Sequence, residues 1–159
     1  MRHVISVTVE NKPGVLAHIS SLFAARGYSI DSLAVGETED PAISRMTIVT
    51  GGDNQIIEQI IKQLRKLIST LKVNDLSEVD FIERDLVLVQ VAVPPGKRGE
   101  IIEIVNIFRG KIVDVGQKDL VVELSGQENK VGAFIDLLRA YGIKEMARTG
   151  SIAMTRGAK

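Results

Sequence analysis

Hydrophobic and polar residues alternate over Arg2–Val9 with the period of two that is typical of a β-strand. Turn-forming residues at Asn11–Gly14 end this alternation, and from Val15 the apolar residues recur at helical spacing as far as Gly27. The rest of the first half predicts two strands, a second helix and a last strand, at Tyr28–Thr38, Ile43–Thr50, Asp53–Ile68 and Lys72–Val79. The first 80 residues therefore predict the order βαββαβ.

The second half of the chain repeats this order. Strands are expected at Asp85–Val93, Lys111–Gly116, Leu120–Ser125 and Lys144–Met154, with helices at Ile101–Phe108 and Val131–Tyr141. Short motifs also recur, since Pro13-Gly14, Arg26-Gly27 and Ile30-Asp31 match Pro95-Gly96, Arg109-Gly110 and Val113-Asp114. We interpret the repeat as a duplication. It predicts an α+β fold of two tandem ferredoxin-like βαββαβ domains, residues 1–80 and 81–159, divided within Val79–Arg84.

In such a fold the helices cover only one face of each sheet. The other face of the first sheet is expected to be semi-polar, because Ser6, Thr8, Ser32 and Ala34 alternate with the apolar strand residues. We expect this face, or the sheet edge, to meet a second copy of the chain, which predicts a homodimer.

Composition excludes several classes of protein. The 159 residues contain 20 basic and 20 acidic side chains, and this zero net charge argues against nucleic-acid binding. The absence of cysteine excludes disulfides and thiolate metal sites. Apolar runs are far shorter than the roughly 20 residues that span a bilayer, and the N-terminus resembles a strand rather than a targeting segment. We therefore expect a cytoplasmic protein without a membrane segment.

No catalytic or metal centre is evident in the sequence. The two histidines, His3 and His18, have no nucleophile and acid arranged as a triad around them. The acidic cluster in Asp80–Asp85 is typical of a solvated linker, with a divalent ion as the alternative. The loop Pro95–Gly99 lacks the spacing of a phosphate-binding loop, so we interpret it as a turn and helix cap. We predict no catalytic residue and no bound metal.

The segment Asn11–Leu16 is the best candidate for a small-molecule site. Gly14 lets a ligand approach the backbone closely, at a helix start whose first N–H groups have no intrahelical acceptor. Asn11 offers a donor and an acceptor, while Val15, Leu16 and Ile30 can enclose an aliphatic group. This chemistry suits an α-amino acid. The alternative is a helix entry that needs Pro and Gly only to turn the chain.

Longer motifs resemble a known family. The stretch VENKPGVLAHISSLFAARGYSIDSL is similar to the opening of an ACT domain, a βαββαβ module that binds amino acids. The segments DPAISRMTI, FRGKIVDV and MARTGSIAMTRG, in this order, resemble the small regulatory subunits of acetolactate synthase (acetohydroxyacid synthase) over essentially the whole chain.

The resemblance implies a non-catalytic subunit that activates a large catalytic subunit and confers feedback inhibition by valine in branched-chain amino acid biosynthesis. The large subunit, rather than this chain, is then expected to hold thiamine diphosphate, magnesium and FAD. The alternative is a stand-alone ACT-type sensor that regulates a different enzyme.

The resemblance also implies an effector site between two copies of the first domain. Its implied residues are Asn11, Pro13, Gly14, Val15 and Leu16 from one chain with Ser29 and Ile30 from the other. Many relatives carry asparagine at the position of Ser29, and the shorter serine predicts a weaker side-chain contact there. Valine is the expected effector, with leucine and isoleucine as weaker candidates.

Overall fold

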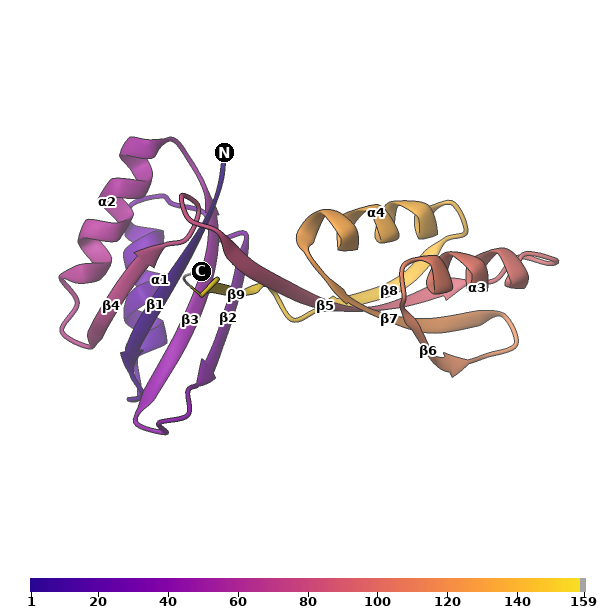
Figure 1. The fold of residues 1–159 in the computed structure, drawn as a ribbon, viewed down its shortest axis with the longest axis horizontal. Helices are drawn as coiled ribbons and strands as arrows, with labels where there is room; N and C mark the ends of the chain where they lie inside the picture. Colours follow the sequence, from indigo (N-terminus) through magenta and orange to yellow (C-terminus); the bar gives the residue numbers. More distant parts are fainter. Residues whose placement is uncertain (158–159) are drawn as a thin grey trace. The chain divides into compact units, whose positions relative to one another are not determined.

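The chain folds as two sets of strands and helices. The computed structural model describes residues 1–157, of which Met1–Ile82 and the segment from Ser151 form one unit and Glu83–Gly150 form the other. Both units follow the order βαββαβ (Figure 1), so the predicted α+β fold with two tandem ferredoxin-like units is confirmed.

The first unit contains a four-stranded antiparallel sheet with the strand order β2-β3-β1-β4. Its elements are β1 (Arg2–Glu10), α1 (Val15–Ala25), β2 (Ser32–Glu37), β3 (Ile43–Gly51), α2 (Asn54–Arg65) and β4 (Thr70–Asp75). Strands β1 and β3 are central and strongly buried, whereas β2 is an edge strand whose second half is exposed.

Both helices of the first unit pack on the same face of this sheet. Ile5, Val7 and Val9 point toward that face, as their alternation predicted, and form one buried cluster with side chains of both helices. The helical members of the cluster are Val15, Ile19, Phe23, Ile57, Ile60 and Leu64. This packing fixes α1, and therefore the loop that precedes it, against the sheet.

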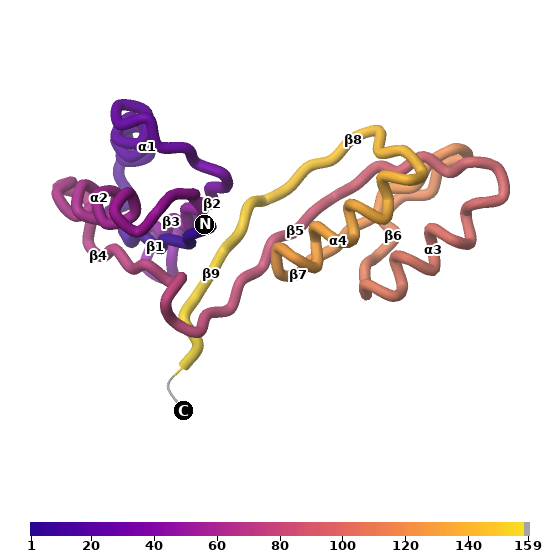
Figure 2. Tube along the Cα trace, turned by 90° about the horizontal axis from the view of Figure 1, so that it is seen from above, coloured from indigo at the N-terminus to yellow at the C-terminus, as the bar shows by residue number. Residues whose placement is uncertain are grey.

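The opposite face of the first sheet is partly covered by the chain's own C-terminal strand, β9 (Ile152–Thr155). Figure 2 shows β9 on the side of the sheet away from α1 and α2. Ala153 is buried with Val4, Val49 and Leu76, and its carbonyl oxygen accepts a 2.9 Å hydrogen bond from Arg45. Part of the face that we expected to meet a second copy is thus covered within one chain.

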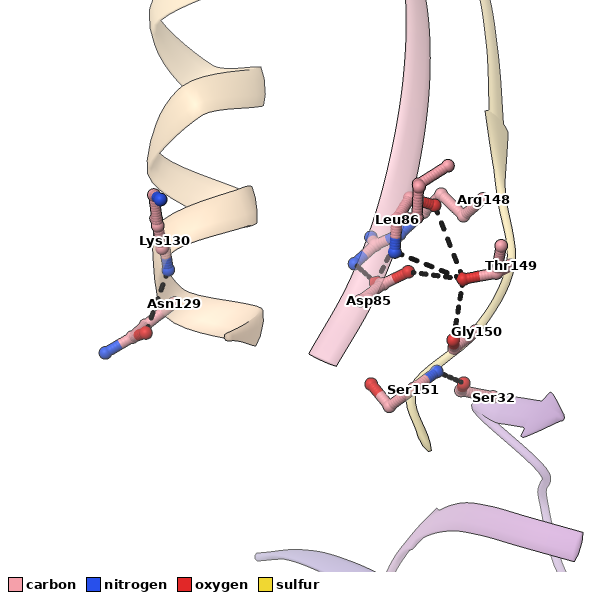
Figure 3. A network of polar contacts seen from close by, with 9 residues as sticks. All are labelled: Ser32, Asp85, Leu86, Asn129, Lys130, Arg148, Thr149, Gly150 and Ser151. Carbon is pink, nitrogen blue, oxygen red and sulfur yellow. Dashed lines mark hydrogen bonds and ion pairs between the residues drawn. The ribbon is translucent and has the colours of Figure 1, made fainter. Parts of the chain in front are cut away.

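The predicted strand over Lys144–Met154 is wrong, because two strands occupy this region. They are β8 (Ile143–Arg148) and β9, and Gly150 between them has φ +84°, a left-handed conformation that interrupts an extended strand. The Ser151 amide then donates a 3.0 Å hydrogen bond to Ser32 Oγ, at the start of β2 (Figure 3). The segment from Ser151 belongs to the first unit, so the predicted second domain of residues 81–159 extends too far.

The second unit repeats the topology, with the strand order β6-β7-β5-β8. Its elements are β5 (Phe81–Ala92), α3 (Arg98–Ile107), β6 (Lys111–Val115), β7 (Asp119–Gly126), α4 (Glu128–Arg139) and β8. Val87, Val89 and Val91 of β5 form its core together with both helices, and Phe134 of α4 is fully buried there.

A buried ion pair joins β5 to β8 in the second unit. Asp85, whose side chain is 2% exposed, accepts hydrogen bonds from the Arg148 guanidinium, and Thr149 Oγ1 lies within 3.4 Å of the same carboxylate (Figure 3). Asp85 is therefore a structural residue, and the solvated acidic linker expected over Asp80–Asp85 is wrong at this position.

Candidate functional site

The loop between β1 and α1, residues 11–14, forms an open helix mouth. Gly14 is the N-cap residue and has φ +86°, a conformation that glycine adopts without the strain caused by a Cβ atom. A Cβ added at Gly14 would meet no atom within 4 Å. The glycine is thus required by the backbone rather than by crowding, and the space in front of it is free within one protomer.

The first turn of α1 presents backbone donors to this space. The Gly14 carbonyl accepts a 3.0 Å hydrogen bond from the His18 amide, and the Val15 amide lies 3.5 Å from the Lys12 carbonyl. The amides of Leu16 and Ala17 have no acceptor within the described part of the chain, and glycine supplies no capping side chain. These two N–H groups, at the positive end of the helix dipole, are suited to a carboxylate.

Asn11 is placed by hydrogen bonds to the β2–β3 turn. Its Nδ2 donates to the Pro41 carbonyl at 2.9 Å and to Glu37 Oε1 at 3.2 Å, while its backbone amide donates to Ala42 at 2.8 Å. The amide nitrogen of Asn11 is therefore used within the protomer, which leaves Oδ1 as the atom that can accept a bond from a ligand. Pro13 is exposed and shapes the loop. Glu37 is an acidic neighbour of the helix mouth that the sequence did not indicate.

The apolar residues of the predicted site have different environments. Leu16 is 43% exposed at the helix mouth, so its side chain is available to a ligand. Val15 is only 7% exposed and packs in the core, where it also lines a hollow of about 480 Å³ with His18 and the loop Lys66–Ser69. Val15 is therefore a core residue of α1, and its role as a ligand contact stays a prediction.

Ser29 and Ile30 lie beyond the other end of α1. The helix has 11 residues, which corresponds to a length of about 16 Å. The predicted strand from Tyr28 begins only at Ser32, so Ser29 and Ile30 belong to the connection before β2. The Ile30 side chain is half-buried against the core. One protomer therefore separates Ser29 and Ile30 from the helix mouth instead of bringing them together.

The corresponding loop of the second unit differs from the first in its side-chain contacts. Gly96 has φ +76°, like Gly14, but Arg98 donates hydrogen bonds to the carbonyls of Gly116 and Gln117 at 2.8 and 3.1 Å. Glu100 accepts a 3.0 Å hydrogen bond from Tyr141, and this bond lowers the pKa of Glu100 while it raises the pKa of Tyr141. The two loops share a backbone shape, but Arg98 near the start of α3 is bonded to the adjacent turn, whereas Leu16 at the equivalent position of α1 is exposed.

Among residues 1–157, no group of three or more His, Asp or Glu side chains is arranged to hold a metal ion. His3 is buried with its Nδ1 3.5 Å from Asp75 Oδ2, whereas His18 is exposed on α1. The described helices are also too short or too polar to cross a membrane.

Comparison with known proteins links both units to one family. Residues 84–157 match the family model for the small subunit of acetolactate synthase, and residues 5–72 match the AHAS small subunit-like ACT domain. The probable acetolactate synthase small subunit of Archaeoglobus fulgidus is 57% identical over 159 residues, covering 100% of this chain and 99% of the relative. The chain belongs to the acetolactate synthase small-subunit family.

Two further relatives support this membership, which the sequence motifs predicted. The acetolactate synthase small subunit of Aquifex aeolicus is 52% identical, over 98% of this chain and 81% of the relative. The crystal structure of the small subunit from Thermotoga maritima superposes with a TM-score of 0.89 at 43% identity, covering 100% of this chain and 99% of the other. The open helix mouth thus lies in the ACT domain of a small-subunit family member.

Proposed function

We propose that this chain is a regulatory subunit that activates the large catalytic subunit of acetolactate synthase and makes it sensitive to valine. The observation that carries the proposal is the open helix mouth at Gly14, with the unpaired amides of Leu16 and Ala17, in the unit that matches the family's ACT domain. The large subunit is proposed to hold thiamine diphosphate, magnesium and FAD, and this chain none of them. The second unit is proposed to contribute to contact with the large subunit.

The effector site is proposed to form between two copies of the chain. Glu37, near the end of β2, bonds to Asn11 and so lies beside the helix mouth, whereas Ser29 and Ile30 precede the start of β2. If the exposed β2 edges of two copies pair antiparallel about a twofold axis, the start of one β2 meets the end of the other. This pairing would place Ser29 and Ile30 of one copy against the helix mouth of its partner.

Valine fits the chemistry of such a site. Its carboxylate would bind the amides of Leu16 and Ala17, where the helix dipole contributes about 0.3–1 kcal/mol, or about 2 kcal/mol if partly buried. Its ammonium group would donate to Asn11 Oδ1 or Glu37. Its isopropyl group would contact Leu16 and Ile30, gaining about 0.8 kcal/mol for each buried methylene equivalent. One additional methylene changes binding by only about 1–3 kcal/mol, so leucine and isoleucine should bind measurably.

Regulation requires that valine bind one state of the assembly more tightly than another. A coupling free energy of about 1–3 kcal/mol between effector and enzyme states would give a useful response. The proposal therefore predicts two separate effects: this chain raises large-subunit activity without valine, and valine removes that increase.

The test is the activity of purified large subunit titrated with this chain, with and without valine, together with calorimetry of valine binding to the chain alone. Stimulation that valine reverses supports the proposal. Valine binding without any effect on the large subunit would instead support a sensor that regulates a different enzyme. Absence of valine binding to the dimer would overturn the proposed effector site.

A further inference from the structure

The segment that contains Ser29 and Ile30 is held by very few hydrogen bonds. It lies outside β2 and so takes no part in the strand ladder that begins at Ser32. Two bonds fix it to β3: the Asp31 amide donates to the Val49 carbonyl at 2.8 Å, and Thr50 Oγ1 donates to the Ser29 carbonyl at 2.6 Å. The Thr50 bond is the one that acts directly on the predicted effector residues.

The hydroxyl group of Thr50 lies in an unusual environment. It is fully buried near the end of β3, paired with His3 of β1, on the face of the sheet that packs against the helices. Valine has the same shape, favours strands and has no polar atom to bury. The hydroxyl therefore costs burial energy that a valine would avoid, and its bond to Ser29 is what compensates for that cost.

The bond also sets the direction of the next backbone donor. The Ser29 carbonyl and the Ile30 amide belong to the same planar trans peptide, so they point in opposite directions. With the carbonyl directed at Thr50, the Ile30 N–H points away from β3, and it has no acceptor within residues 1–157. Thr50 thereby keeps this donor turned outward.

We propose that Thr50 is a positioning residue of the effector site, which it orients through the Ser29–Ile30 peptide without touching the ligand. This inference rests on the proposed valine site between two copies. Without the Thr50 hydroxyl the peptide can rotate, and the outward orientation of the Ile30 amide is no longer enforced. Valine affinity, rather than folding alone, should therefore depend on an atom buried inside one protomer.

The test compares Thr50→Val with Thr50→Ser in the full chain, using calorimetry with valine and thermal denaturation. Thr50→Val should weaken valine binding about tenfold, as expected for the loss of one well-placed hydrogen bond. Thr50→Ser keeps the hydroxyl and should bind within about threefold of the wild type. Thr47→Val is the matched control, because Thr47 is a 3% exposed threonine of the same strand that makes no bond to Ser29. It should leave valine affinity unchanged.

The outcomes separate this inference from the proposed function. If wild-type chain does not bind valine, the effector site itself is refuted. If wild type and Thr50→Val bind valine equally, the site stands and the role of Thr50 is refuted, even when the melting temperature falls. Should Thr50→Val fail to fold, the pair Thr50→Ser and Thr50→Cys repeats the comparison, because serine and cysteine share a shape and cysteine is a poor donor. Equal valine affinities in that pair would overturn the proposal.

Discussion

Replacing Gly14 with aspartate tests the helix mouth more directly than any other change. Gly14 has φ +86° and an added Cβ would meet no atom within 4 Å, so the new side chain projects into the free space before α1 without displacing protein atoms. The introduced carboxylate would occupy the place proposed for the carboxylate of valine. Binding should therefore be lost while the fold is retained.

Gly14→Asp should reduce the stability of the fold much less than it reduces the affinity for valine. A residue other than glycine in this conformation costs about 1–2 kcal/mol, and an acidic group at a helix N-terminus returns about 0.3–1 kcal/mol. The net loss of stability is about 1 kcal/mol, which lowers the melting temperature of a unit of this size by about 4–8 °C. Two like charges about 4 Å apart near a protein surface repel by about 4 kcal/mol. Valine affinity should consequently fall by about three orders of magnitude.

The assay is calorimetric titration of valine into the full chain, with melting temperatures measured in parallel. Gly96→Asp is the matched control, because Gly96 has φ +76° and equally open surroundings in the second unit. It should lose similar stability and keep its valine affinity. Gly14→Asn separates charge from bulk, since asparagine tolerates this conformation and is neutral. Two results would refute the assignment of the ligand carboxylate to this helix mouth. One is a valine affinity of Gly14→Asp within threefold of the wild type, and the other is an equal loss of valine affinity in Gly14→Asp and Gly96→Asp.

Three further predictions concern polar contacts in the two units. Asn11→Ala removes two side-chain hydrogen bonds to the β2–β3 turn, so thermal denaturation should show a loss of about 1 kcal/mol and calorimetry a weaker affinity for valine. Arg148→Ala leaves the 2% exposed Asp85 carboxylate unpaired and should cost about 3–5 kcal/mol in urea denaturation. Asp85→Ala should cost less, because Arg148 is 37% exposed and can be hydrated; equal losses would contradict this explanation. The hydrogen bond from Lys144 lowers the pKa of Asp119 in the folded chain. The stabilisation that this bond gives is therefore fully present above the pKa of an unfolded aspartate, about 3.9. It is lost as the pH falls through the lower pKa of the folded state. Lys144→Met should accordingly be less stable than wild type at pH 7 and equally stable at strongly acidic pH.

The sequence predicted those parts of the fold that depend on local periodicity. The alternation of Ile5, Val7 and Val9 identified the buried face of β1. The helix predicted from Asp53 is α2, and Asp53 caps it by accepting a 2.9 Å bond from the Ile56 amide. Periodicity failed where a single backbone conformation decides the outcome. The residues on both sides of Gly150 favour strands, and no local pattern indicates that its positive φ separates β8 from β9 or that the following segment belongs to the first unit.

The sequence indicates the backbone shape of the candidate site more clearly than the environment of its side chains. Gly14 and Asn11 were chosen as candidates because turn and cap chemistry is local. The contact of Asn11 with Glu37 joins residues far apart in sequence, and no local pattern indicates it. The burial of Val15 was not indicated either, because apolar character does not distinguish a core residue from the wall of a pocket. Thr50 was not recognised because a threonine in a strand is ordinary until its hydroxyl is seen to bond outside the ladder.

The two units of the duplicated chain are equivalent in backbone at the start of their first helix. Gly96 follows Gly14 by 82 residues and shares its positive φ, and the register shifts after Thr8 and Gln90 are separated by the same interval. At this spacing the counterpart of Gly27 is Arg109, which has φ +59°, so the sequence match of Arg26-Gly27 with Arg109-Gly110 is offset by one residue.

The two units are no longer equivalent at the connection that holds Ser29 and Ile30 in the first unit. The connection before β2 is residues 26–31, whereas the connection before β6 is only residues 108–110. Ile30-Asp31 and Val113-Asp114 therefore do not occupy equivalent positions in the fold, because Val113 lies within β6. The second unit lacks a counterpart of the segment that Thr50 holds, and Arg98 is bonded to the adjacent turn. Freeing this helix start from Arg98 by Arg98→Ala should thus create no second valine site, since the residues that would complete it from a partner copy are missing.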